Sequence, residues 1–456
     1  MSQPTAIERL ACFVAEHRFR VDDALRGVVR DSVIDTLGCI LAGAQEQPAV
    51  LARQCFAALT TGGVPVYGTS TATAPDHAAM LNAIAGHALD MDDWEIPGNS
   101  HASVVMLPAL LAAREATLPG EGLVDAYIAG FEVTARLGEA INFEHYARGW
   151  HTTGTLAALG AAAAVSRLWR LNRQQAANAL SLAVSRAAGL TRQFGSHAKS
   201  LQAGFACQSG YSAARMARAG LGGQAHVLEG RQGYFALTGH DDRERHEAAL
   251  GMLGGELALA QYGQVIKPYP SCGYTHRVID CARQLFARGL DPRRVQSINI
   301  ELPDFHAEIL PFEQPEGRRE ALFSLPFCCA MGLLQGDLTL RDLDAEAWNE
   351  EPVRRLVAMT RVRPFAPARP ALNYDPRQPD RLSLPLDDGS TLEASVPYPR
   401  GAPQNRLSLD EILAKFATNA ARLRPLQAVQ FEKLSAWPVL DDVLPLFDSL
   451  GALDEP

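Results

Sequence analysis

An apolar pattern of helical period runs almost continuously from residue 5 to about residue 255, and it limits the possible folds more than any other feature. One apolar stripe at this spacing comprises Leu123, Tyr127, Phe131, Leu137 and Ile141. The longest apolar run, residues 155–166, is rich in Ala and Gly and shorter than the roughly 20 residues that cross a bilayer. We therefore expect a mostly α-helical domain with closely packed helices and a buried helix at this run.

Capping motifs mark where helices begin. Thr5 with Glu8, and Asn172 with Gln175, have the spacing of a capping box, in which each side chain satisfies a free backbone N–H. Ser408 with Glu411 repeats this motif after Pro403. Leu407 and Ile412 flank it as a hydrophobic staple. Helical structure is thus expected at both ends of the chain.

The pattern changes between these helical parts. Residues 267–276 contain two prolines and one glycine, which interrupt the helical period before a helix expected over 277–287. Residues 295–304 alternate like a strand, and residues 381–399 indicate two strands joined at Asp388-Gly389, a strong hairpin signal. An α+β domain inserted in a helical one explains this order.

A length of 456 residues also favours two domains over a single core. We expect an all-α domain over residues 1–258, an α+β domain over 259–403 and a helical return to the first domain over 404–456. Pockets commonly form where two domains meet. The junction is therefore the first place to look for a site.

Charge and cysteine usage narrow the class of protein. The net charge of −9 argues against nucleic-acid and anionic-membrane partners, which need basic patches. An anionic substrate still fits if Lys, Arg and His converge locally. The first residues lack the apolar core of a signal peptide, and the eight cysteines form no CxxC pair. These features favour a protein of the reducing cytoplasm without structural zinc or disulfides.

Residues 87–101 combine four carboxylates and two imidazoles beside an apolar run. In one interpretation the Asp side chains cap the following helix and His101 lies on the surface. In another, Asp90 lies one helical turn before Asp93 and Trp94 and points into a cleft beside His101, where burial tunes acid–base strength. A third interpretation makes Asp90, Asp92, Asp93 and His101 the ligands of a metal-dependent hydrolase.

Two further motifs precede expected helices. His151 and Thr152 stand at the start of the Ala-rich helix, where backbone N–H groups suit a carboxylate or phosphate, although the threonine can simply cap. Lys199 follows Ser196 by three residues and falls in a first helical turn, where the helix dipole disfavours a cation. Such a lysine serves as a surface residue, a carboxylate ligand or a base. Its S-x-x-K motif lacks the S-D-N and K-T-G partners of serine β-lactamases.

The turn at residues 267–276 concentrates donors at the expected domain junction. Lys267, Ser271 and His276 are spaced along it, and Pro and Gly make its shape specific. The alternative is a linker stiffened by prolines. A substrate anion is the expected partner if these donors converge.

Taken together, the motifs HALDMDD with a following His, GWHTTGTLAALGAAAA, SHAKSLQAGFA and KPYPSCGYTH resemble the 2-methylcitrate dehydratase family, also called MmgE/PrpD. FSLPF at 323–327 and VPYPRGAPQNRLSLDEILAKF extend the resemblance nearly end to end. It implies a large all-α domain made from both chain ends, a smaller α+β lid domain and a homodimer. Members include 2-methylcitrate dehydratase, cis-aconitate decarboxylase and iminodisuccinate epimerase. None of them needs a metal or organic cofactor to handle a carbanion next to a carboxylate.

The resemblance also implies site residues. The catalytic candidates are Asp90, His101, His151 and Lys199. The substrate-binding candidates are Asp93, Trp94, Thr152, Lys267, Ser271 and His276. A carbanion beside a carboxylate adds negative charge there, so preorganised cations lower the barrier most. Lys199 and His151 would supply that stabilisation, while His101 or Asp90 would exchange the proton.

Some positions depart from the family pattern. Trp94-Glu95 stands where decarboxylase-like members carry a small Thr, the spacing to His101 is one residue longer, Ala102 replaces a Pro, and Thr152 replaces another. Phe327 stands where the decarboxylase uses Tyr, so a hydroxyl that could protonate the product is missing. These departures disfavour cis-aconitate decarboxylation.

The leading expectation is therefore a cofactor-independent hydro-lyase acting on a small di- or tricarboxylic acid. An epimerase of the iminodisuccinate type is the nearest alternative, and a decarboxylase follows. A metal-dependent hydrolase and a non-catalytic helical binding protein represent different classes. An iron–sulfur enzyme is disfavoured because no cysteines have cluster spacing.

Overall fold

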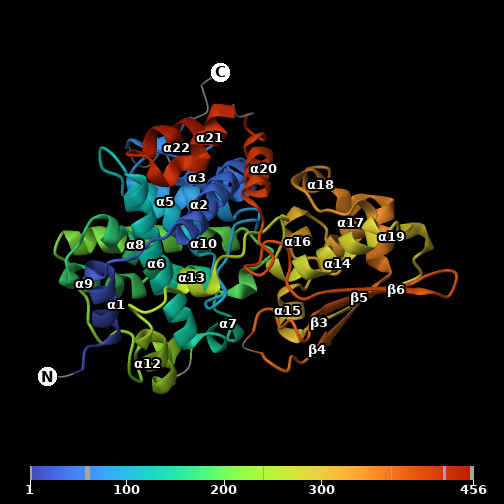
Figure 1. Cartoon of the computed structure of the whole chain (residues 1–456), viewed down its shortest axis with the longest axis horizontal. Coiled ribbons are helices and arrows are strands. Elements are labelled where there is room, and N and C mark those ends of the chain that lie inside the picture. The colour runs from blue at the N-terminus through green and yellow to red at the C-terminus, as the bar shows by residue number, and fades with distance from the viewer. Residues whose placement is uncertain (1–2, 57–61, 240, 371, 425–427, 452–456) are drawn as a thin grey trace.

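The chain forms a large helical domain and a smaller α+β lid that extends from one side of it (Figure 1). The computed structural model describes residues 3–56, 62–239, 241–370, 372–424 and 428–451. The expected mostly α fold with a smaller α+β part is confirmed. In the described residues no helix is both long and apolar enough to span a membrane.

Helices of the first domain surround a core of buried Ala, Leu and Val. Its helices before the lid are α1 (Ala6–Glu16), α2 (Asp23–Gly43), α3 (Gln47–Phe56), α4 (Pro75–His87), α5 (Ala102–Ala112), α6 (Gly120–Ile141), α7 (Glu144–Ala147), α8 (Thr152–Leu168), α9 (Arg173–Val184), α10 (Ala198–Arg218), α11 (Tyr234–Thr238), α12 (Arg243–Gly251) and α13 (Ala258–Tyr262). A two-stranded ribbon pairs β1 (Val64–Pro65) with β2 (Ala72–Thr73). The predicted stripe on α6 is buried along its whole length.

Close packing of α8 between α6 and α10 forms the centre of this domain. A Cβ atom at Gly130 of α6 would lie 2.6 Å from the Gly160 carbonyl oxygen of α8. A Cβ atom at Gly210 of α10 would lie 2.6 Å from the Ala158 carbonyl oxygen of α8. Only glycine permits these backbones to approach so closely. The Ala- and Gly-rich composition of α8 thus brings the N-termini of α8 and α10 close to one another.

The lid contains a four-stranded sheet with helices on one face (Figure 1). The strands are β3 (Ile298–Pro303), β4 (Thr360–Phe365), β5 (Asp380–Pro385) and β6 (Thr391–Val396), in the order β4-β3-β5-β6. β3 and β4 are parallel, and the other pairs are antiparallel. The lid helices are α14 (His276–Ala287), α15 (Asp304–Ile309), α16 (Arg318–Ala321), α17 (Leu325–Gln335), α18 (Leu340–Asp344) and α19 (Glu351–Ala358). The strand and hairpin expected near 295–304 and 381–399 are confirmed, with Gly389 at φ 82° in the turn.

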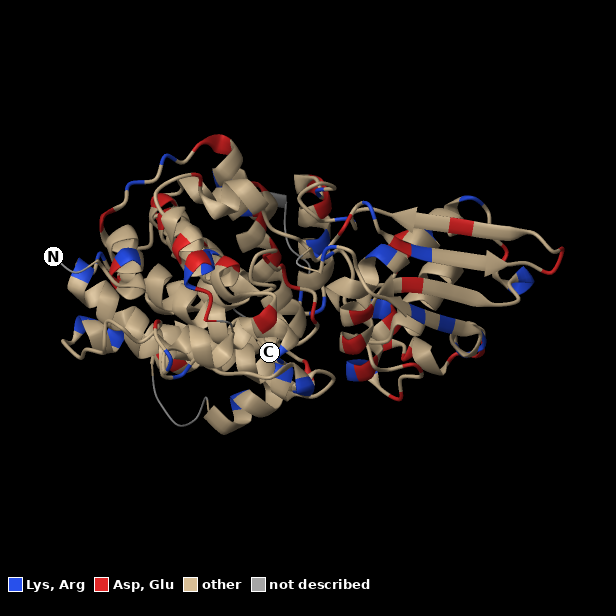
Figure 2. Cartoon of the chain, turned by 90° about the horizontal axis from the view of Figure 1, so that it is seen from below, with Lys and Arg blue, Asp and Glu red and all other residues tan. Residues whose placement is uncertain are grey.

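After the lid, the chain returns to the helical domain through α20 (Leu409–Ala420), α21 (Ala428–Ala436) and α22 (Leu444–Gly451). α20 packs against α2, near the blue helices of the first domain in Figure 1. The capping boxes at Thr5, Asn172 and Ser408 are confirmed. Acidic and basic residues are interspersed over both domains (Figure 2).

Candidate active site

The segment from Ala88 to His101 joins α4 to α5 without forming a helix. Asp90 and Asn99 adopt left-handed backbone conformations, with φ 49° and 59°. The expected helical turn from Asp90 to Asp93 is therefore wrong. The capping interpretation is wrong as well, because His101 is the residue before α5 and no side chain caps that helix. The irregular backbone sends neighbouring Asp side chains in different directions.

Asp90 lies between two lysines that reach it from opposite ends of the sequence. Its Oδ1 atom is 3.0 Å from Lys199 Nζ and 2.7 Å from Lys267 Nζ. Burial by itself would raise the pKa of Asp90, but the two ammonium groups outweigh it and hold the pKa below its ordinary value. Two cations thus face one carboxylate, and both ammonium groups line the pocket, where they can meet an anionic substrate.

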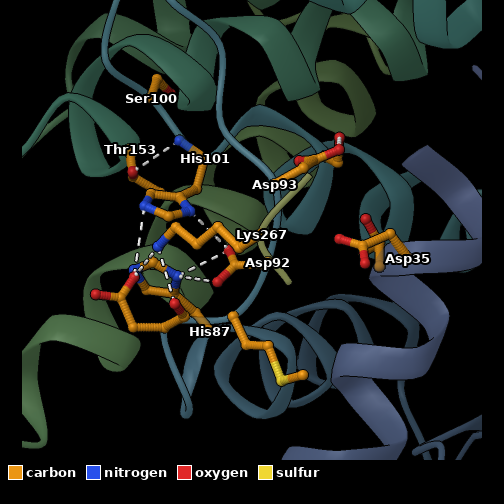
Figure 3. A network of polar contacts seen from close by, with 12 residues as sticks. Asp35, His87, Asp92, Asp93, Ser100, His101, Thr153 and Lys267 are labelled. Atoms are coloured by element: carbon orange, nitrogen blue, oxygen red, sulfur yellow. Dashed lines mark hydrogen bonds and ion pairs between the residues drawn. The ribbon is translucent and has the colours of Figure 1, made fainter. Parts of the chain in front are cut away.

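Asp92 holds two imidazole rings behind this group (Figure 3). His87 Nδ1 lies 2.9 Å from Asp92 Oδ2, and His87 Nε2 lies 2.8 Å from Lys199 Nζ. Because an ammonium group only donates, Nε2 accepts and Nδ1–H donates to Asp92. His101 Nδ1 lies 3.1 Å from the same carboxylate, and its Nε2 lies 3.7 Å from Asp90 Oδ1. Asp92 therefore orients both rings, and His101 presents Nε2 toward Asp90.

Burial keeps the imidazoles neutral. It lowers the pKa of His101 to about 4 although Asp92 opposes the shift. Burial also lowers the pKa of His87, with a further contribution from Lys199. A neutral His101 can accept a proton at neutral pH.

His151 stands at the start of α8 and is buried beside Lys199. Its Nδ1 atom is 2.6 Å from Gln202 Oε1. Burial, followed by the Lys199 charge, holds the pKa of His151 well below its ordinary value. This shift favours a neutral His151 ring, which can stabilise charge through an N–H group and has one lone pair that can accept a proton.

These residues line a narrow pocket with a cavity volume of about 40 Å³, room for a few groups the size of a water molecule, each of which needs roughly 10–15 Å³. Its polar side chains are Asp90, Asn99, His101, His151, Lys199 and Lys267. Its aromatic side chains are Trp94, Tyr146, Phe194, Tyr274 and Phe323. Six of the ten predicted site residues therefore line the pocket, namely Asp90, Trp94, His101, His151, Lys199 and Lys267.

The four other predicted residues lie outside this pocket. Asp93 turns away, where its Oδ2 accepts hydrogen bonds from Ser103 Oγ at 2.7 Å and Gln264 Nε2 at 3.0 Å. Burial and then Asp35 raise the pKa of Asp93 well above its ordinary value, so its carboxyl group is protonated. Asp93 therefore does not line this pocket.

Thr152, Ser271 and His276 make hydrogen bonds outside the pocket, next to residues that line it. Thr152 Oγ1 donates to the Asn99 carbonyl at 2.6 Å. Ser271 Oγ is bonded to Thr275 Oγ1, and His276 Nε2 lies 3.3 Å from the Ser271 carbonyl oxygen. The hydroxyl groups of Thr152 and Ser271, which we expected to bind a substrate anion, thus make hydrogen bonds to other groups of the protein. Cys272, Gly273 and Tyr274 of the same turn line the pocket instead.

Two tyrosines were not anticipated from the sequence. Tyr146 and Tyr274 line the pocket, and burial raises the pKa of both, which favours their protonated hydroxyls, although the Tyr274 hydroxyl already donates to Asn373 Oδ1 at 3.0 Å. Phe327, by contrast, is buried in the lid core near Trp348 and lines no part of this pocket. The argument that its missing hydroxyl disfavours decarboxylation is therefore wrong. No local motif distinguished these aromatic residues from core.

One group of side chains could hold a metal ion. Ligand atoms of His87, Asp90, Asp92 and His101 lie within 4.8 Å of one another. Lys199 and Lys267 already contact the same ligand atoms of Asp90, and Lys199 also contacts His87. A divalent cation would have to displace these two ammonium groups, whose positive charges repel it, so the donor set does not fit a metal ion.

A second cavity with a volume of about 330 Å³ shares Asp90, Lys199 and Phe323 with the pocket. It extends between the domains toward Arg319 of the lid. Arg319 Nη1 lies 2.9 Å from Gln47 Oε1 and 2.7 Å from His197 Nε2 of the helical domain. This opening gives a route from the surface to Lys199.

The fold and site define a class of two-domain enzymes that carry an acid–base pocket between a helical domain and an α+β lid. Residues 8–246 match the MmgE/PrpD N-terminal domain, and residues 269–437 match the MmgE/PrpD C-terminal domain. The chain belongs to the MmgE/PrpD family, which confirms the resemblance seen in the sequence. The second match continues beyond the lid into α20, which packs on the helical domain.

Similar proteins are named cis-aconitate decarboxylases. The mouse protein (Mus musculus) is 26% identical over 89% of this chain and 85% of its own length. The human protein (Homo sapiens) is 26% identical over 97% and 91%. The Aspergillus terreus protein is 25% identical over 92% and 90%. These relatives and the family support a lyase-like function at the level of the family.

Proposed function

We propose that this protein is a cofactor-independent lyase that forms and protonates a carbanion next to a carboxylate of a small di- or tricarboxylic acid. The observation that carries the proposal is the placement of Lys199 and Lys267 on Asp90, beside the neutral rings of His101 and His151. The ammonium groups bind the substrate carboxylate, and a neutral imidazole exchanges the proton.

Electrostatics explain why this arrangement suits such chemistry. A carbanion beside a carboxylate delocalises into that group and places a second negative charge on its oxygens. One preorganised donor that meets such a charge is worth about 2.7–4 kcal/mol of the barrier. Lys199 and Lys267 are buried, so little water screens them. Both lysines can therefore contribute to the transition state.

Decarboxylation is the first candidate for the bond that breaks. The relatives that match along most of this chain carry the name cis-aconitate decarboxylase. Phe194 and Phe323 lie with their ring centres 5.2 Å and 5.6 Å from Lys199 Nζ and give the pocket an apolar side. Loss of CO2 is favoured where a carboxylate is desolvated. The Tyr146 hydroxyl, which lines the pocket, can then donate a proton to the product carbon.

Dehydration of a 2-hydroxy acid is the second candidate. It requires an acid that protonates the departing hydroxyl group. Two ammonium groups on one carboxylate offer this, because one can bind the substrate while the other donates its proton.

The test is incubation of the purified protein in D2O with cis-aconitate, with 2-methylcitrate and with iminodisuccinate. Released CO2 and proton NMR spectra are recorded. Decarboxylation gives CO2 and one deuterium in the product, whereas dehydration gives an unsaturated acid without CO2. Deuterium at the α carbon without either product indicates an epimerase. The proposal is rejected if no acid reacts and none protects the protein against thermal unfolding.

A further inference from the structure

The side chain of Gln202 lies between the pocket and the surface, directly behind His151. Gln202 follows Lys199 by three residues on α10, so the same helical turn carries both side chains. Lys199 enters the pocket, whereas Gln202 is partly exposed and reaches the start of α8. α10 thus carries Lys199, which lines the pocket, and Gln202, which contacts the pocket residue His151 from outside the pocket.

The orientation of the Gln202 amide is determined by a second contact. Its Nε2 atom donates to the Leu190 carbonyl oxygen at 3.3 Å, and its Oε1 atom lies 2.6 Å from His151 Nδ1. The reversed amide would place two acceptors against each other at Leu190. Because Oε1 carries no hydrogen, the proton of this bond resides on His151 Nδ1.

The Leu190 segment is itself held against the His151 segment. The His151 N–H donates to the Gly189 carbonyl at 3.0 Å, and Trp150 pairs with Leu190 in an antiparallel bridge. The Thr191 N–H donates to the Gly149 carbonyl at 2.9 Å. These backbone bonds keep the Leu190 carbonyl in place and with it the Gln202 amide.

A neutral imidazole has one N–H, so a proton on Nδ1 leaves a lone pair on Nε2. His151 Nε2 has no hydrogen-bond partner among the residues that the structure describes, and the ring lines the pocket. The groups that face His151 are His87 of α4, His101 of the preceding loop and Lys199 of α10, together with the edge of Phe194. Lys199 is the one cation among these, and its charge opposes protonation of the ring.

We propose that Gln202 is a positioning residue that holds His151 as the Nδ1–H tautomer and so directs a proton-accepting Nε2 atom at the substrate. The inference rests on the proposed function for the identity of the proton donor, a carbon or hydroxyl group next to a carboxylate. The tautomer itself is independent of the substrate. His151 is then the base where the reaction breaks a C–H bond, as in dehydration, and Asp90 is left to hold the two lysines.

The first test reads the tautomer without any substrate. Protein labelled with ¹⁵N in its 12 histidines is compared with a His151→Gln variant to assign the His151 signals. We expect protonated Nδ1 and unprotonated Nε2 in the parent protein, and a shift toward the Nε2–H tautomer in Gln202→Leu. The inference is overturned if the parent carries its proton on Nε2, or if Gln202→Leu leaves the tautomer unchanged.

The second test reads the pH profile of turnover. Gln202→Leu should lower kcat about 10- to 100-fold with little change in KM, as is typical when the partner of a functional histidine is lost. Gln202→Glu keeps the acceptor and adds a negative charge beside His151. Its kcat should therefore be close to that of the parent protein, and the acid limb of its kcat/KM profile should lie about one to three pH units higher. A purely structural role would not move that limb.

Gln208→Glu is the matched control, because Gln208 is partly buried on the same helix and makes no hydrogen bond to a pocket residue within the described part of the chain. It should leave the tautomer and the pH profile unchanged. An unchanged profile in Gln202→Glu contradicts the inference. If no polycarboxylate is turned over, the proposed function fails, while the NMR measurement still decides the role of Gln202.

Discussion

Replacement of Lys199 with Met tests the most important charge in the pocket. Methionine keeps most of the length of the side chain and removes the ammonium group that lies 3.0 Å from Asp90 Oδ1 and 2.8 Å from His87 Nε2. If this ammonium meets the developing carbanion, its loss costs about 3–4 kcal/mol in the transition state. We therefore expect kcat to fall roughly 10²- to 10³-fold.

The fold should tolerate this substitution. Asp90 retains Lys267 at 2.7 Å, so its carboxylate stays paired. The remaining cost is a buried His87 Nε2 atom without a donor, about 1–3 kcal/mol. This is less than the roughly 5–15 kcal/mol that stabilises a typical domain. Melting curves of the variant should therefore remain cooperative.

Initial rates with cis-aconitate or another active polycarboxylate measure the effect, and thermal melts report on folding. Lys433→Met is the matched control, because Lys433 is exposed on α21 and far in the sequence from every pocket residue. Lys199→Arg should recover part of the rate, since it restores a positive charge without the compact ammonium geometry. The reasoning is refuted if Lys199→Met folds and keeps kcat within about threefold of the parent, a difference below 1 kcal/mol.

Three further predictions concern protons and metals. The acid limb of kcat/KM should lie below pH 6.5, because burial lowers the pKa of both His101 and His151, and a limb near pH 6.5 would show that burial does not shift these rings. Asp93→Asn should keep kcat within about threefold, because Asp93 faces Ser103 and Gln264 outside the pocket. Burial raises the pKa of Asp93, so the folded state keeps a proton that the unfolded state releases above about pH 4. The free energy of unfolding should therefore fall as the pH rises, and urea melts should show a smaller fall for Asp93→Asn than for the parent protein. Prolonged EDTA treatment should leave the rate unchanged, and a stoichiometric metal in the active protein would contradict our interpretation of the four clustered ligands.

Much of the fold could be predicted because its signals are local. Capping boxes at Thr5, Asn172 and Ser408 depend on residues three positions apart, and the hairpin at Asp388-Gly389 depends on a two-residue turn. The irregular segment from Ala88 to His101 gave no such signal. Its left-handed residues, Asp90 and Asn99, are held by tertiary contacts rather than by local preference. This backbone turns Asp93 toward Ser103 and Gln264 and away from the pocket, which the sequence motif did not indicate.

The site was predictable where a motif carried charge or a ring. Asp90, His101, His151, Lys199 and Lys267 do line the pocket. Their protonation states depend on burial and on one another, which no sequence pattern encodes. The aromatic wall was missed because Tyr146, Phe194 and Phe323 resemble core residues in the sequence. Only the packing of the lid on the helical domain brings them to the pocket.

The most direct test of a carboxylate pocket held by two lysines is a crystal structure with bound tricarballylate, a saturated tricarboxylate that lacks a reacting bond. We predict one substrate carboxylate within about 2.7–3.2 Å of Lys199 Nζ and Lys267 Nζ, with His151 Nε2 facing the adjacent carbon. A ligand bound away from both lysines, or a metal ion held by His87, Asp90, Asp92 and His101 in the active protein, would contradict the account.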